Sequence, residues 1–182
     1  KIIEPSFGHL ACGYDGKGKL PSPEDLVENV LLAVARDKDL KGKKVLVNAG
    51  PTEESIDPIR VITNHSSGKM GYAIARQAAF RGAGVTLVSG PTNLKSPMGV
   101  EVISIKSAED MYQEMVKNAD QADIIIMAAA VADYTPVTTA ENKIKKTEGD
   151  FSIPLKRTKD ILLSIGQQKK DGQFICGFSM ET

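Results

Sequence analysis

The sequence predicts an α/β protein with a Rossmann-like, doubly wound and mostly parallel sheet and helices on both faces. First, short apolar runs alternate with helical segments from residue 44 onward, an order typical of an open α/β sheet. Second, the 18 residues of the segment 50–67 separate the first run from the next helix, where a loop of about two to six is usual. Ligands of such sheets bind beyond the carboxyl ends of the strands, so this segment is a candidate site.

The N-terminal 42 residues stand apart from this alternation. Residues 1–22 are rich in glycine and show no hydrophobic period, so we expect an appendage in which residues 1–20 are disordered. Ser22 can cap the N-terminus of a helix, and the backbone of Pro23 already has the φ angle of a first helical residue. The apolar residues that follow at helical spacing predict a helix over 23–36. Residues 23–42 are therefore predicted to form a linker helix, and residues 43–182 the main domain.

The main domain is predicted to contain strands and helices in alternation. Strands are expected at 44–48, 85–89, 100–105, 123–127 and 174–178, the first and last of them buried, with an exposed or edge strand at 151–155. Helices are expected at 69–81, 108–118 and 160–168. The predicted inward residues are Met70, Ala73, Ile74 and Ala78 in the first of these helices, and Met111, Met115 and Val116 in the second.

Composition argues against several classes of partner. Lys+Arg and Asp+Glu both number 23, so the formal net charge is zero and nothing favours a nucleic acid or a membrane surface. No apolar run approaches the roughly 20 residues of a transmembrane helix. Two cysteines in unlike settings give no disulfide framework, and we expect a cytoplasmic protein. Because the first residue is not Met, we expect the natural N-terminus to lie upstream.

The end of the long segment is a candidate phosphate site. Ser66 or Ser67 can cap the following helix while backbone N–H groups around Gly68 cradle a phosphate. A P-loop is excluded because Thr63 and Met70 stand where that motif needs Gly and then Ser or Thr. The dinucleotide fingerprint is excluded because Ser66 replaces its first Gly. The alternative is a capped helix whose small residues pack closely on a strand.

Further candidates lie near the same predicted edge. Asn64 is either a turn former or a ligand contact, and Asp133 is either a turn residue or a carboxylate beside a ligand. The small residues 128–132 let a planar ligand approach the backbone. Three lysines within 143–146 suit a triphosphate and could close over it as a lid, although such a run is also typical of a solvated face. Phe178 either stacks on a base or belongs to the core.

Taken together, these motifs closely resemble phosphopantothenate–cysteine ligase over about residues 41–182. The likeness rests on Ala49-Gly50-Pro51-Thr52, Asp57-Pro58-Ile59-Arg60, Asn64-His65-Ser66-Ser67-Gly68-Lys69-Met70-Gly71, Val88-Ser89-Gly90-Pro91, Ala129-Ala130-Val131-Ala132-Asp133-Tyr134, Lys143-Ile144-Lys145-Lys146 and Gly177-Phe178. The run over 64–71 is highly specific. Leu10-Ala11-Cys12-Gly13, with Gly16 and Gly18, is similar to the closing stretch of phosphopantothenoylcysteine decarboxylase, which bacteria fuse ahead of the ligase.

The resemblance implies part of a bifunctional coenzyme A biosynthesis protein. Residues 1–22 would be the C-terminal remnant of the decarboxylase domain, and residues 43–182 a ligase domain that is incomplete at its C-terminus. In the implied reaction, 4′-phosphopantothenate attacks the α-phosphate of CTP and releases pyrophosphate, and the amine of cysteine then displaces CMP from the acyl-cytidylate. The resemblance also implies Mg²⁺ and a homodimer. FMN belongs only to the decarboxylase domain, where Cys12 resembles the proton donor.

The resemblance also implies roles for individual residues. Asn64 and Lys143 would be catalytic, with Asn64 holding the acyl-cytidylate. The implied nucleotide-binding residues are Ser66, Ser67, Gly68, Met127, Ala128, Ala129, Ala130, Asp133, Lys143, Lys145, Lys146, Thr158, Lys159, Asp160, Ile161 and Phe178. The stretch 158–161 departs from the common bacterial Asn-Pro-Asp-Ile but keeps the acid. We expect no protein cage for the metal, because Mg²⁺ commonly rides on nucleotide phosphates.

Two other functions stay open beside the ligase. A nicotinamide-dependent oxidoreductase can use the same kind of fold, but a fold alone does not assign a function and the glycine fingerprint is missing. A non-catalytic scaffold would keep the ligase-like fold without turnover.

Overall fold

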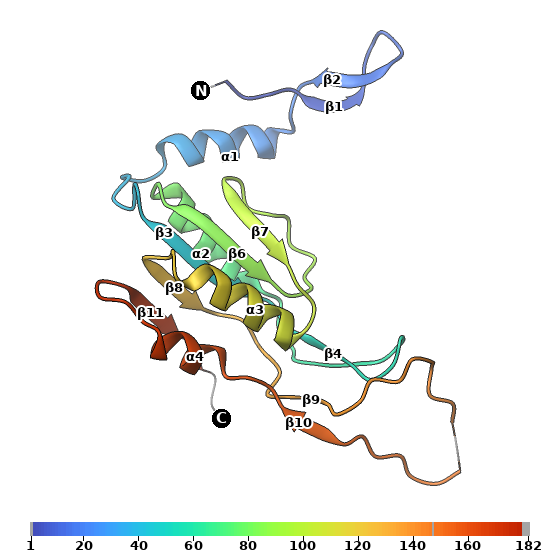
Figure 1. Cartoon of the computed structure of the whole chain (residues 1–182). Helices are drawn as coiled ribbons and strands as arrows, with labels where there is room; N and C mark the ends of the chain where they lie inside the picture. The colour runs from blue at the N-terminus through green and yellow to red at the C-terminus, as the bar shows by residue number, and fades with distance from the viewer. Residues whose placement is uncertain (1, 147, 180–182) are drawn as a thin grey trace.

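The structure confirms the predicted α/β fold around a five-stranded parallel sheet. The computed structural model describes residues 2–146 and 148–179. Neighbouring strands run parallel in the order β11-β8-β3-β6-β7 (Figure 1). These strands are β3 (Lys44–Ala49), β6 (Gly84–Ser89), β7 (Val100–Ser104), β8 (Ile124–Met127) and β11 (Phe174–Gly177). The chain winds outward from β3 to β7 and returns to β8 beside β3, so the strand order reverses at the centre of the sheet.

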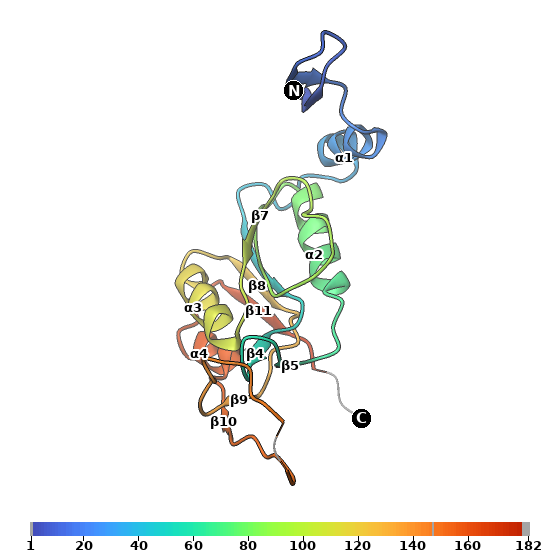
Figure 2. The same cartoon turned by 90° about the vertical axis from the view of Figure 1, so that its right-hand side faces the viewer.

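Helices cover both faces of the sheet, as Figure 2 shows. α2 (Lys69–Phe80) lies on one face, and α3 (Ala108–Ala119) lies with α4 (Ile161–Gln167) on the other. β3 supplies both cores, since Val45 and Val47 pack beneath α2 and Leu46 packs beneath α3. None of the helices within the described ranges has the length and apolar character of a membrane span.

The prediction for the inward face of α2 is wrong at Met70 and Ala73. Met70 is 45% exposed and Ala73 is also exposed. The cause is a close approach at Gly71, where an added Cβ atom would lie 2.5 Å from the Cβ of Ala49. This contact turns α2 so that a face of small residues meets the sheet. The buried residues of the helix are Gly71, Ala75, Ala78, Ala79 and Phe80.

α3 matches its prediction in both position and orientation. The Asp110 N–H donates to Ser107 Oγ at 3.1 Å, and the Ser107 N–H donates to Asp110 Oδ2 at 2.9 Å, which completes a capping box. Met111 and Met115 are fully buried, and Val116 packs against the same core. The amphipathic period of this segment therefore predicts the buried face correctly.

Two strands differ from their predictions, one in its position along the chain and the other in its burial. The strand expected at 151–155 lies later in the chain, as β10 (Leu155–Arg157), and pairs with β9 (Tyr134–Pro136). Pro154 has no N–H for a ladder and accepts a hydrogen bond from the Val137 N–H at 3.0 Å. The last strand, expected to be buried, is the edge strand β11, where Phe174 is 58% exposed.

The long segment after β3 is partly ordered as a hairpin. β4 (Glu53–Ser55) pairs antiparallel with β5 (Val61–Thr63). The Ala108 N–H donates to Glu54 Oε1 at 2.8 Å, which fastens the hairpin to the first turn of α3. Strands of three residues are too short to show a hydrophobic period, so the sequence alone does not reveal them.

The expectation of a disordered N-terminal tail is wrong for the residues described. β1 (Ser6–His9) and β2 (Asp15–Lys19) form an antiparallel hairpin that stands away from the sheet (Figure 1). Gly16 and Gly18 leave room for the Leu10 side chain, whose methyl groups would lie 3.5 and 3.2 Å from added Cβ atoms. The glycines that suggested disorder therefore allow one apolar residue to cover the second strand.

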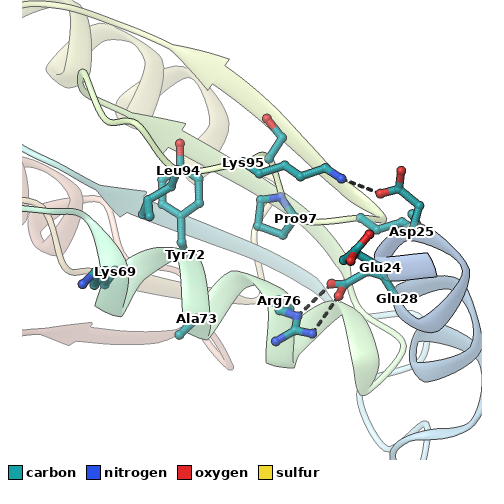
Figure 3. Close-up of a pocket in the computed structure, with 12 residues that line it drawn as sticks. Glu24, Asp25, Glu28, Lys69, Tyr72, Ala73, Arg76, Leu94, Lys95 and Pro97 are labelled. Atoms are coloured by element: carbon teal, nitrogen blue, oxygen red, sulfur yellow. Dashed lines mark hydrogen bonds and ion pairs between the residues drawn. The ribbon is translucent and has the colours of Figure 1, made fainter. Parts of the chain in front are cut away.

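The helix predicted over 23–36 is present as α1 (Pro23–Val34), and ion pairs join it to α2 and to the loop 94–98. Arg76 in α2 donates to both Glu28 carboxylate oxygens at 2.7 Å, and Lys95 pairs with Asp25. Between α1, α2 and the loop 94–98 lies a cavity of about 400 Å³ (Figure 3). The opposite side of α1 exposes Val27, Val30 and Val34. No residue of α1 is buried, and its contacts with the rest of the chain combine these ion pairs with the packing of Leu32 against the core beneath α2.

Candidate functional site

The two loops at the centre of the sheet run side by side beyond the ends of their strands. After β3, the Gly50 carbonyl accepts from the Ala130 N–H at 2.9 Å, and the Thr52 N–H donates to the Ala130 carbonyl at 3.3 Å. Pro51 and Ala130 form a parallel bridge between these bonds. The hydrogen-bonded pattern of the sheet thus continues into the loops, at the place where doubly wound proteins bind ligands.

Two buried polar side chains hold these loops in place, and sequence reasoning missed both. Asn48 Oδ1 accepts from the Ala128 N–H at 2.7 Å and from the Ala129 N–H at 2.9 Å. Thr52 Oγ1 accepts from the Ala132 N–H at 3.0 Å. Asn48 and Thr52 are both 0% exposed. Asn48 could have been found from the sequence, because it ends a buried apolar strand and a buried polar side chain needs a hydrogen-bond partner.

Asn64 lies against the alanine-rich loop after β8. Asn64 Nδ2 donates to the Ala130 carbonyl at 3.2 Å and to the Val131 carbonyl at 3.1 Å. The side chain is otherwise exposed at the end of the segment 50–67. These bonds fix the orientation of the amide and leave its oxygen directed away from the two carbonyl groups.

The predicted serine cap of α2 is wrong. Gly68 is the N-cap, with a left-handed φ of 73°, and no side chain caps the helix. Ser66 Oγ instead accepts from the Gly68 N–H at 3.4 Å, and Ser67 makes no cap. An added Cβ at Gly68 would lie 2.8 Å from Thr92 Cγ2 and 3.3 Å from the Gly50 backbone. Close packing of three loops, rather than a side-chain oxygen, therefore shapes the start of this helix.

A cavity of about 650 Å³ opens at the carboxyl ends of β8 and β11. The predicted nucleotide-binding residues that line it are Met127, Ala129, Asp133, Thr158, Lys159, Asp160, Ile161 and Phe178. Phe178 is 54% exposed, and its N–H donates to the Met127 carbonyl at 3.0 Å. Asp133 is exposed at the rim. The cavity thus combines an aromatic ring, small residues and a carboxylate within one wall.

Three of these residues also have structural partners. The Thr158 N–H donates to the Asp133 carbonyl at 2.9 Å. Asp160 is the N-cap of α4 and accepts from the Leu163 N–H at 2.8 Å. Lys159 pairs with Glu109 at 2.7 Å, and this hydrogen bond raises the pKa of Lys159. A ligand in the cavity therefore meets a wall that the protein has already ordered.

The lysine run lies apart from this cavity. Lys143, Lys145 and Lys146 line a second cavity of about 610 Å³ together with Arg60 and Phe151. All three lysines are exposed, and they belong to the extended arm between β9 and β10 (Figure 1). Within one chain, the structure does not bring these lysines to Asp133 and Phe178.

Metal-binding and redox groups are sparse among the described residues. No cluster of three or more His, Cys, Asp or Glu side chains that could hold a metal ion occurs in the ranges 2–146 and 148–179. Cys12 is an exposed free thiol at the tip of the N-terminal hairpin, and Cys176 is a partly exposed free thiol in β11.

Comparison with known proteins identifies the family. Residues 40–182 match the DNA/pantothenate metabolism flavoprotein C-terminal domain, a span that contains the whole parallel sheet and both loops at its centre. The chain belongs to the DNA/pantothenate metabolism flavoprotein C-terminal domain family. The N-terminal hairpin and α1 precede the part that matches this family.

Curated relatives of this flavoprotein C-terminal domain include a coenzyme A biosynthesis protein and a decarboxylase. The chain is 49% identical over 184 residues to the coenzyme A biosynthesis bifunctional protein CoaBC of Bacillus subtilis, covering all of this chain and 45% of that protein. It is 46% identical over 186 residues to a cysteine/cysteine sulfinic acid decarboxylase from an unknown prokaryotic organism, covering 52% of that protein. The chain therefore spans about half the length of these curated relatives.

A solved structure agrees with the fold of this flavoprotein C-terminal domain. The crystal structure of the C-terminal domain of CoaBC is similar with a TM-score of 0.65 and 44% sequence identity, over 75% of this chain and 63% of that one.

Proposed function

We propose that this chain is a phosphopantothenate–cysteine ligase domain that acts in coenzyme A biosynthesis. It would join 4′-phosphopantothenate to cysteine and convert CTP to CMP and pyrophosphate. The observation that carries the proposal is the contact of Asn64 with the Ala130 and Val131 carbonyls, beside a cavity of nucleotide size rimmed by Asp133. The coenzyme A names of its relatives support the same reaction.

The proposed chemistry has two steps. A carboxylate oxygen of 4′-phosphopantothenate bonds to the α-phosphorus of CTP, and the bond to pyrophosphate breaks. The cysteine nitrogen then bonds to the acyl carbon of the acyl-cytidylate, CMP leaves with its electron pair, and the amine loses a proton. Both steps shift negative charge, which preorganised donors stabilise. Asn64 would orient the acyl-cytidylate, while the Met127–Ala129 backbone and Phe178 would receive the base.

Mg²⁺ would bind in the ligase cavity, whereas FMN would belong to another part of the longer protein. The Asp133 carboxylate at the cavity rim is a hard oxygen ligand of the kind that Mg²⁺ takes, together with water and nucleotide phosphates. Bound Mg²⁺ would neutralise phosphate charge. FMN would serve only the decarboxylase part of the longer protein, where Cys12 would be the proton donor, and the bifunctional name of the Bacillus subtilis relative supports a second activity. We propose a cytoplasmic location, in keeping with two free thiols.

The reaction can be tested on the full-length protein. With 4′-phosphopantothenate, cysteine and Mg²⁺, we expect CTP-dependent release of pyrophosphate and formation of phosphopantothenoylcysteine. Without cysteine, pyrophosphate release should stop near one equivalent per active site, because the acyl-cytidylate stays bound. ATP in place of CTP tests the choice of base. A folded protein that releases no pyrophosphate with either nucleotide contradicts the ligase, and tight binding of NADH favours the oxidoreductase.

We also propose a homodimer in which the lysines of one chain serve the cavity of the other. Two observations support it. The lysine run lies outside the cavity of its own chain, and the arm that carries it exposes Val137 and Phe151, next to the exposed Leu155 of β10. An isologous dimer allows such an exchange between two copies of one surface.

Complementation tests this exchange. Lys143→Ala and Asn64→Asp chains are each expected to be inactive alone. Co-expressed, they should recover about one quarter of the wild-type activity, because half of randomly paired dimers are mixed and each has one intact site. Mixed dimers without recovered activity would place the lysine and Asn64 of a site in the same chain.

A further inference from the structure

Asp57 is a buried carboxylate with donors on both of its oxygens. Its side chain is 0% exposed in the turn between β4 and β5. Oδ1 accepts from the N–H groups of Ile59 and Arg60, both at 2.8 Å. Oδ2 accepts from Arg60 Nε at 3.0 Å, from Arg60 Nη2 at 2.6 Å and from the Ile144 N–H at 3.1 Å. One oxygen therefore holds the local turn, and the other reaches a distant part of the chain.

The distant part is the centre of the lysine run. Ile144 donates its N–H to Asp57, and its carbonyl accepts from Arg60 Nη2 at 2.7 Å. The Asp57–Arg60 pair thus binds both the N–H and the carbonyl of Ile144. The start of the same arm is also fastened, since the Ala140 N–H donates to the Ile56 carbonyl at 3.0 Å. The side chains of Lys143 and Lys145, on either side of Ile144, are exposed.

The electrostatics agree with this arrangement. Hydrogen bonds from the Arg60 guanidinium hold the pKa of the Asp57 carboxyl well below its usual range. The carboxylate is therefore ionised throughout the neutral range and accepts charge-assisted bonds, which are the stronger kind. Flexible lysine side chains gain most from a fixed backbone, because less freedom is then lost when they bind an anion.

We propose that Asp57 is a positioning residue that, through Arg60 and the backbone of Ile144, fixes Lys143 and Lys145 for binding the triphosphate of the nucleotide. This inference rests on the proposed ligase function. Asp57 itself lies below the surface and would act through the lysines rather than touch the substrate.

In the full-length protein, Asp57→Asn keeps the bonds that hold the local turn and removes the bonds that reach the Arg60 side chain and Ile144. The amide keeps an oxygen for the turn, but it presents an NH₂ group to the Arg60 donors and to the Ile144 N–H. We expect trypsin to cleave after Lys143 and Lys145 about tenfold faster, and the KM for CTP to rise about tenfold, as for the loss of a charge-assisted bond. The KM for cysteine should stay within about twofold, which a general loss of structure would not allow.

Asp39→Asn is the matched control. Asp39 accepts from Arg81 Nε at 2.9 Å and from Nη2 at 2.6 Å, so it repeats the two-bond pair far from the lysine run. Its cleavage pattern and its KM for CTP should equal those of the wild type. Ile144→Pro is the second variant, because it removes the N–H donor to Asp57 Oδ2 and leaves the turn around Asp57 unchanged. Trypsin does not cleave a Lys–Pro bond, so cleavage of this variant is followed after Lys145 alone.

The outcomes separate the two proposals. Equal rates of cleavage after Lys145 in wild type, Asp57→Asn and Ile144→Pro overturn the role of Asp57. Faster cleavage with no change in the KM for CTP, or with an equal rise in the KM for cysteine, overturns it as well. A wild-type protein without CTP turnover overturns the ligase function, and the positioning for CTP with it. The cleavage pattern then still reports whether Asp57 holds the lysine run.

Discussion

Asn64→Asp is expected to lower ligase turnover at least about a hundredfold, the usual effect of removing one preorganised polar group from an active site. Asn64 Nδ2 donates to the Ala130 and Val131 carbonyls. A carboxylate in its place sets a negative oxygen against these two carbonyl oxygens and cannot keep the orientation of the amide. Pyrophosphate release in the absence of cysteine should continue, so the acyl-cytidylate should accumulate and be detectable by mass spectrometry.

Asn29→Asp is the control for the same chemical change. Asn29 Nδ2 also donates to a backbone carbonyl, that of Asp25 at 2.9 Å, but it lies in α1, away from the loops at the centre of the sheet. Its turnover should match the wild type. If Asn64→Asp turns over within about twofold of wild type, Asn64 has no part in stabilising the transition state.

Asn48→Leu is expected to destabilise the domain by about 3 kcal/mol, because it leaves two partly buried N–H groups without an acceptor. These are the N–H groups of Ala128 and Ala129, at 2.7 and 2.9 Å from Asn48 Oδ1. For a chain of this size, such a loss lowers the melting temperature by roughly 6–12 °C. Hydrogen exchange at the two alanine amides should become faster, and this local measurement stays interpretable in a protein with several domains.

Thr52→Val provides a graded comparison. The change keeps the volume and removes one acceptor, the partner of the Ala132 N–H at 3.0 Å. We expect a loss of about 1–2 kcal/mol, smaller than that of Asn48→Leu. If the two variants lose equal stability, or if the exchange of the Ala128 and Ala129 amides does not change, the two bonds to Asn48 do not hold the loop.

The sequence predicted those parts of the fold in which burial on a repeating face decides the structure. β3 and α3 are such elements, since apolar residues of β3 enter both cores and α3 buries Met111 and Met115. Edges were harder, because the bounds of β10 depend on its pairing with β9 rather than on its own period. The orientation of α2 depends on one close contact at Gly71, which a period of apolar residues does not reveal.

The candidate site divides in the same way. The carboxyl ends of parallel strands meet at one edge of the sheet, so the sequence placed Asn64 and the alanine loop at the same edge. The contact between Asn64 and Ala130 joins residues 66 positions apart. The lysine run belongs to an arm rather than to a strand end, and no strand order fixes where an arm lies. The roles of Asn48 and Asp57 were missed because each depends on partners about 80 positions away.

The parallel hydrogen bonding between Gly50 and Ala130 determines which substitutions can alter the substrate preference of this protein. Loops that continue the hydrogen bonding of the sheet are already ordered before a ligand arrives, so little conformational entropy is lost on binding. Selectivity would then reside in side chains carried on a rigid frame. Altered nucleotide preference should therefore arise from substitutions around Asp133 and Phe178, and insertions between residues 49 and 52 should be poorly tolerated.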